Sequence, residues 1–223
     1  MTNEEKKDFV PIKIISLYLV LLYSLWFAYH FFITNFLNLF PASVSALIGD
    51  GLIKNLVWTL PAVLLIKKYK DNIQIDLKEM LTWKKECNRY LLLFPAFAAY
   101  LIVIEMLANG GKLVINDTFG IDKIIIFLFV GVTEEFAFRG WLLNATIPRN
   151  ENAAIAVNAV LFLAIHFPRW ISEGIFISNF ANRGFVSIIA LSIIFSIIFI
   201  RSKNIILPIT LHMLWDLLIF MLG

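Results

Sequence analysis

The chain has 223 residues, of which 60% are hydrophobic and 16% charged, and its mean hydropathy is +0.83. A soluble domain of this length would not need so much apolar surface, and several runs approach or exceed the roughly 18–20 apolar residues that span a bilayer. The alternating pattern of a membrane β-barrel is absent. The net charge is a modest +3 with the basic residues gathered in loops, which indicates membrane topology and no nucleic-acid partner.

We therefore expect an all-α, polytopic integral membrane bundle with about seven transmembrane helices, since a bilayer offers the backbone no hydrogen-bond partners. The second span is short and can begin near Ala42, which would place Lys54 inside it. The polar stretch 67–89 predicts a basic cytosolic segment at the membrane surface. It ends an N-terminal part of residues 1–89, and a helical core of residues 90–223 follows. The predicted spans are 14–35, 52–66, 90–107, 123–145, 152–167, 184–200 and 204–222.

The distribution of Lys and Arg predicts the orientation. With the N-terminus inside, most basic residues, including Lys6 and Lys7, fall in the inner loops. Because positive charge concentrates on the cytoplasmic side, we expect a cytoplasmic N-terminus and an external C-terminus. No cleavable signal-peptide pattern is present, so the first span is expected to stay in place. Frequent Ile, Asn and Lys indicate an AT-rich bacterial genome, and we expect an integral protein of the bacterial plasma membrane. The outer loops hold only four basic residues, Lys112, Lys123, Arg169 and Arg183.

Ionisable residues inside the spans are the functional candidates, because the bilayer makes them costly. Glu135 and Arg139 are spaced i, i+4 and predict a desolvated ion pair. Glu134 projects about 100° away from Glu135 on the same helix. It is expected to lack a fixed cation and to suit general acid–base catalysis.

Two further spans carry the same i, i+4 spacing. Phe162 and His166 share a face in FLAIH, and His212 and Asp216 share a face in HMLWD. If the three spans pack together, these faces can converge on Glu134. By contrast, His30 is expected at the membrane interface, and the GDG of residues 49–51 is expected in a loop.

The three motifs together resemble the CAAX-protease and bacteriocin-processing family, CPBP or Abi, which includes the Rce1-type CAAX prenyl endopeptidases. The family pattern is EExxxR, FxxxH and HxxxN or HxxxD on separate membrane helices. Here it reads EEFAFR at 134–139, FLAIH at 162–166 and HMLWD at 212–216, in the same order. The resemblance covers about residues 123–220 and identifies the core of residues 90–223 as the catalytic part.

The resemblance implies an intramembrane protease. Glu134 and His166 correspond to the pair that activates water, and His212 with Asp216 to the pair that stabilises the oxyanion. Glu135 and Arg139 match the supporting ion pair, and Phe162 matches the packing residue of the second motif. Asp216 stands where the best understood members have Asn, and an ionised Asp cannot donate a hydrogen bond to an oxyanion. A protonated Asp216, orientation of His212 or metal binding would each account for it.

Three readings stay open at this point. The preferred one is a glutamate-type endopeptidase that needs no cofactor and cleaves a peptide precursor or a membrane-anchored protein. The second is a zinc metalloprotease, with Zn²⁺ held by Glu134, His166 and His212, although the HExxH motif is absent. The third is a non-catalytic membrane protein that acts in bacteriocin immunity or as an accessory factor.

Overall fold

The computed structural model describes residues 9–222, and within them it contains helices and no strand. The prediction of an all-α fold is therefore confirmed for these residues. Lys6 and Lys7, which contribute to the predicted orientation, lie outside the described residues.

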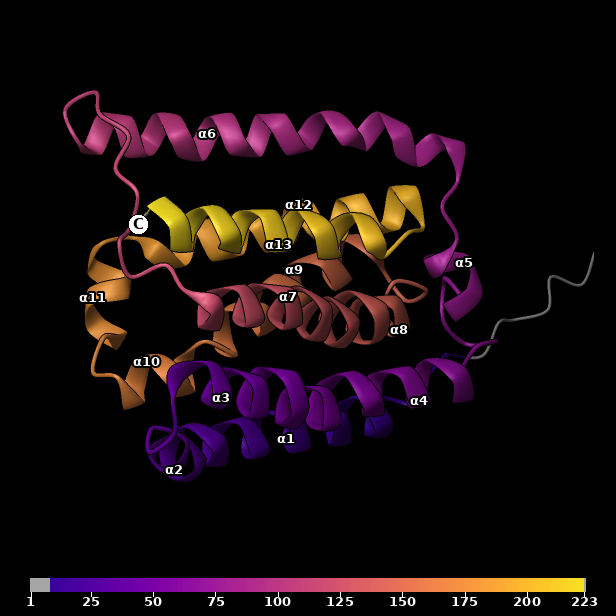
Figure 1. Ribbon diagram of the computed structural model, residues 1–223. Coiled ribbons are helices and arrows are strands. Elements are labelled where there is room, and N and C mark those ends of the chain that lie inside the picture. The colour runs from indigo at the N-terminus through magenta and orange to yellow at the C-terminus, as the bar shows by residue number, and fades with distance from the viewer. Residues whose placement is uncertain (1–8, 223) are drawn as a thin grey trace, which may run out of the picture.

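The helices run back and forth along one direction (Figure 1). Short π-helical segments join α1 to α2 and α7 to α8, and two more join α3 to α4, so each of these sets forms one long helix. In chain order the α-helices are α1 (Ile12–Ala28), α2 (Thr34–Leu37), α3 (Ala42–Ala46), α4 (Leu60–Lys68), α5 (Leu77–Leu81), α6 (Leu93–Ala108), α7 (Ile121–Glu135), α8 (Asn144–Thr146), α9 (Glu151–Ala164), α10 (Phe167–Ser172), α11 (Phe176–Ala181), α12 (Gly184–Ser202) and α13 (Ile206–Leu222).

Five helices among the described residues are long and apolar enough to cross a membrane: Ile12–Leu37, Ala42–Lys68, Lys85–Ala108, Glu151–Ser172 and Gly184–Ser202. Two more belong to the bundle but differ in kind. The helix of residues 121–146 carries the charged motif, and α13 is apolar but shorter. The structure thus supports a helical membrane protein without establishing the predicted number of seven spans.

The helix that carries EEFAFR lies at the centre of the bundle. The long helix formed by α3 and α4 packs on one side of it, and α13 packs on the other. α12 packs against α9, and α6 lies along the outer side of α13 (Figure 1). Because helices from both halves of the chain surround α7, charged side chains there are shielded from lipid.

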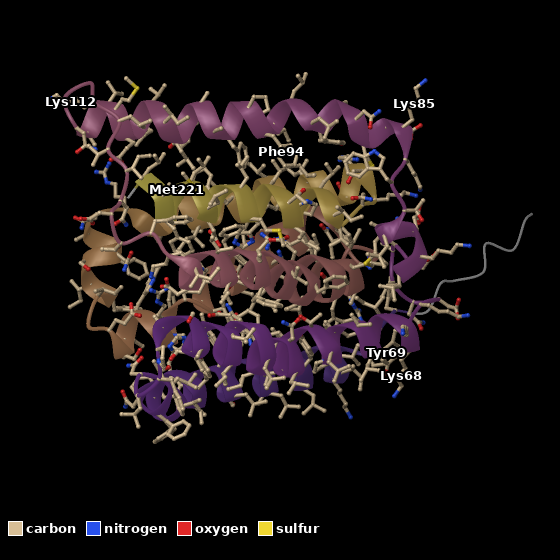
Figure 2. The ribbon with its side chains drawn as sticks, in the orientation of Figure 1. Lys68, Tyr69, Lys85, Phe94, Lys112 and Met221 are labelled. Atoms are coloured by element: carbon tan, nitrogen blue, oxygen red, sulfur yellow. The ribbon has the colours of Figure 1, made fainter. Side chains whose placement is uncertain are left out.

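The basic segment of residues 67–89 packs into the hydrophobic core of the bundle. Ile73, Ile75 and Met80 are buried in the core. The Asn144 side chain accepts a hydrogen bond from the Ile75 amide at 2.9 Å and donates one to the Ile75 carbonyl at 2.7 Å. Figure 2 shows Lys68 and Lys85 at this end of the bundle and Lys112 at the other. The segment therefore closes one end of the bundle.

Candidate functional site

Glu135 and Arg139 form the ion pair that their spacing predicts. Arg139 Nη1 donates to Glu135 Oε1 at 3.0 Å, and both side chains are fully buried. Arg139 Nη2 also donates to the Ser192 carbonyl of α12 at 3.3 Å. Its guanidinium lies 4.3 Å from the ring centre of Phe162, so the pair joins the helix of the first motif to α9 and α12.

His212 is held by the same carboxylate. Its Nδ1 lies 2.9 Å from Glu135 Oε1, which can only accept, so Nδ1 carries the hydrogen if Glu135 is ionised. Its Nε2 lies 3.6 Å from Asp216 Oδ2 and 4.0 Å from Glu134 Oε2. Glu135 therefore orients the imidazole, and the opposite nitrogen is directed toward Glu134 and Asp216.

A close crossing of two helices brings His212 to this position. A Cβ atom added to Gly131 of α7 would lie 2.7 Å from Met213 Cγ and 3.1 Å from the Ile209 carbonyl oxygen. Small residues allow helix backbones in membranes to approach closely. Gly131 thus lets α13 approach α7 one turn before the two glutamates, next to His212.

His166 lies where α9 ends and α10 begins. Its Nδ1 lies 2.9 Å from the Phe162 carbonyl oxygen, one helical turn earlier. Because a carbonyl only accepts, Nδ1 carries the hydrogen and Nε2 is left as the basic nitrogen. The Phe162 ring lies 5.4 Å from the His166 ring and 6.1 Å from the His212 ring, between the two histidines.

Glu134 differs from the expectation in one respect. It projects away from Glu135, as the helical period predicts, but it does not lack a cation. Lys54 Nζ donates to Glu134 Oε1 at 3.0 Å, and the lysine is only 4% exposed. The expectation was wrong because periodicity within one helix cannot show which side chain a neighbouring helix supplies.

The site opens into a cavity of about 780 Å³. Glu134, His166, His212 and Asp216 all line it, which brings the four predicted catalytic residues together. The lining continues to the end of the bundle formed by the α2–α3 turn, the start of α7, α10 and the end of α13. Figure 1 shows α2 and α10 at the end opposite α5.

Two residues that the sequence placed elsewhere also line this cavity. Asp50 of the GDG stretch lies in a helical segment, not in a loop, and its Oδ1 is 3.6 Å from Lys54 Nζ. His30 stacks edge-on against Trp26 with its ring centre 4.5 Å away. Its Nε2 is buried without a hydrogen-bond partner among the described residues, and its side chain lines the cavity, which the sequence did not predict.

The zinc reading can be tested against this donor set. Glu134 Oε1 accepts a hydrogen bond from an ammonium group, which competes with any metal cation for this carboxylate. Across residues 9–222 no three His, Cys, Asp or Glu side chains come together in an arrangement that could hold a metal ion. Glu134, His166 and His212 as arranged here do not fit a zinc site, because a catalytic zinc needs three convergent protein ligands.

The fold and site define a polytopic helical membrane protein with a buried carboxylate–histidine site open to a polar cavity. Residues 118–218 match the family model described as type II CAAX prenyl endopeptidase Rce1-like, and this segment contains all three motifs. Residues 118–218 therefore carry an Rce1-like domain, which agrees with the predicted resemblance to the CAAX-protease, or CPBP, family. Comparisons with curated proteins and with solved structures give no match.

The matched segment begins after α6 and so excludes Lys54, Asp50 and His30. Sequence reasoning assigned none of these residues to the site. One signal was available for Lys54, since a lysine inside an apolar span needs a buried partner. No comparable signal identified Glu134 as that partner.

Proposed function

We propose that the protein is an intramembrane endopeptidase that hydrolyses peptide bonds with a water molecule activated by Glu134 and His166. The convergence of Glu134, His166, His212 and Asp216 on one cavity carries the proposal. The Rce1-like domain supports the reaction class. The cavity volume of about 780 Å³ lies within the range of roughly 300–1,000 Å³ typical of ligand pockets.

The reaction needs a base, a site for the developing oxyanion and an acid. Glu134, with His166 Nε2 nearby in the cavity, takes a proton from water, and the water oxygen attacks the carbonyl carbon of the substrate amide. His212 acts as an imidazolium: Nδ1–H donates to Glu135, and Nε2–H donates to the oxyanion that forms. Protonated Glu134 then gives its proton to the amide nitrogen, the C–N bond breaks, and a new carboxyl and amino terminus result.

Asp216 acts on His212 in this scheme. At 3.6 Å from His212 Nε2, it helps to keep that nitrogen protonated and directed into the cavity. Because it accepts but does not donate when ionised, it does not bind the oxyanion itself. The scheme needs no metal ion, in line with the poor fit of the donor set to zinc.

The proposal also includes the orientation of the chain in the membrane and its division into two parts. The basic segment of residues 67–89 lies on the cytoplasmic side of a bacterial plasma membrane, so the cavity opens on the external side, where the C-terminus lies. Residues 90–223 form the catalytic core, and residues 1–89 the N-terminal helices. The substrate is a peptide precursor or a membrane-anchored protein that is cleaved near this surface.

Terminal proteomics tests the proposal in cells that express the wild type or Glu134→Gln. Glu105→Gln is the matched control, because Glu105 lies near the end of α6 and does not line the cavity. We expect new protein termini with the wild type and Glu105→Gln and none with Glu134→Gln. Identical termini in all three strains would contradict the protease assignment and support the non-catalytic alternative.

A further inference from the structure

Lys54 is the one buried lysine among the described residues, and it lies against Glu134. Its ammonium donates to Glu134 Oε1 at 3.0 Å and lies 3.6 Å from Asp50 Oδ1. Two tryptophan rings, those of Trp26 and Trp58, lie on other sides with centres 4.9 Å from Nζ. Aromatic faces attract a cation where water is excluded, so the two rings and the two carboxylates hold the lysine end group in place.

The contact has a consequence for the base. A carboxylate can take a proton from water only while it is ionised, and an adjacent ammonium favours the ionised form. The bond to Lys54 also occupies Oε1. Oε2 is left on the side of His212, whose Nε2 is 4.0 Å away. The lysine thus selects both the charge state and the reactive oxygen of Glu134.

The tryptophans that surround Lys54 also help to position His166. Trp26 Nε1 donates to the Ile165 carbonyl at 3.0 Å, directly before His166. Trp26 is 8% exposed and also packs against Trp58, with ring centres 4.9 Å apart. One aromatic cluster from residues 12–59 therefore supports both groups that activate water, although it lies outside the Rce1-like segment of residues 118–218.

We propose that Lys54 is a positioning residue of the hydrolytic reaction, which holds Glu134 as an ionised base with Oε2 directed at the water. Lys54 does not transfer the proton. It acts through Glu134, and its ammonium charge is the property that matters. This inference rests on the proposed function and adds to it a residue from the N-terminal half of the chain.

The test uses full-length protein in proteoliposomes and a quenched fluorogenic peptide that spans a cleavage site found by terminal proteomics. In Lys54→Met we expect kcat to fall on the order of 100-fold, the lower range for acid–base catalysis, with little change in KM. Lys54→Arg keeps the positive charge, so its kcat should stay close to that of the wild type. Lys67→Met is the matched control, because Lys67 is an exposed lysine of α4, and it should match the wild type.

Chemical rescue separates positioning by charge from a merely structural role. In Lys54→Ala, ethylammonium added to the assay should enter the cavity and raise kcat, whereas ethanol of the same size should not. A folded Lys54→Met with wild-type kcat would overturn the proposal. So would a loss that neither Lys54→Arg nor ethylammonium recovers, because the lysine would then only support packing.

Two further measurements distinguish misfolding from loss of catalysis and test the role of Lys54 separately from the protease assignment. Thermal unfolding in detergent identifies variants that fail to fold, and Lys54→Gln, which keeps a polar end group, replaces Lys54→Met in that case. Glu134→Gln is assayed alongside. If it is inactive while Lys54→Met is fully active, the role of Lys54 is wrong and the protease assignment stands. If Glu134→Gln itself is active, the proposed function fails.

Discussion

Glu135 Oε1 lies 2.9 Å from His212 Nδ1 and also accepts the hydrogen bond of Arg139 at 3.0 Å. One fully buried oxygen thus serves both the cation of its own helix and the histidine of α13. The second glutamate of EEFAFR is therefore more than half of an ion pair. It connects the first motif to the third and fixes the orientation of the proposed oxyanion donor.

Glu135→Gln should unfold more easily and lose activity. The change leaves Arg139 buried without its carboxylate, and breaking a buried pair typically costs about 3–5 kcal/mol in free energy of unfolding. Glu134→Gln should be less destabilised, since Asp50 remains beside Lys54, yet equally inactive. Thermal unfolding of the two variants in one detergent gives the comparison, and a Glu135→Gln protein as stable as the wild type would contradict the bridging role.

Gly131→Ala should separate α7 from α13. The added methyl group meets the Ile209 carbonyl oxygen at 3.1 Å, and backbone cannot move aside as a flexible side chain can. Overpacking of this kind costs about 1–3 kcal/mol, and the shift moves His212 away from Glu135. Leu128→Ala on the exposed side of the same helix is the control. Full activity in Gly131→Ala would show that the close crossing is not required.

Asp216→Asn should remain active, whereas Asp216→Ala should lose much of its rate. The carboxamide of Asn keeps an acceptor for His212 Nε2, now 3.6 Å from Asp216 Oδ2, and adds an N–H donor toward the oxyanion. Initial rates of the two variants on one peptide check this. An inactive Asp216→Asn would show that the negative charge itself is essential and would require a different role for Asp216.

Metal removal should leave the rate unchanged. The ammonium of Lys54 already neutralises Glu134, and no three His, Cys, Asp or Glu side chains within residues 9–222 are arranged to hold a metal ion. Activity is measured after treatment with EDTA and with 1,10-phenanthroline, next to elemental analysis of the purified protein. Stoichiometric zinc whose loss abolishes activity and whose return restores it would establish the metalloprotease alternative.

The sequence predicts the helical membrane class and the internal geometry of each motif well. Apolar run length indicates the spans, and the 3.6-residue period places Glu135 with Arg139 and separates Glu134 from both. These properties are local, since each depends on one helix. The order of three motifs on separate helices was sufficient to indicate the family that residues 118–218 match.

Contacts between helices were not predictable in the same way. The hydrogen bond from Lys54 to Glu134 joins residues eighty positions apart, and that from His212 to Glu135 joins residues seventy-seven apart. Nothing in either helix alone encodes the partner. The GDG stretch, expected in a loop, lies in a helical segment, and there Gly49 allows the Tyr29 side chain to pack closely against the helix.

The role of Glu134 as the base of peptide hydrolysis is tested most directly by comparing purified wild-type protein with Glu134→Gln in matched proteoliposomes. Each is incubated with a peptide carrying the cleavage site, and the products are identified by mass spectrometry. We expect the wild type to produce two fragments whose masses sum to that of the peptide plus one water, and Glu134→Gln to produce neither. Cleavage at the same bond and rate by a folded Glu134→Gln protein would contradict this role.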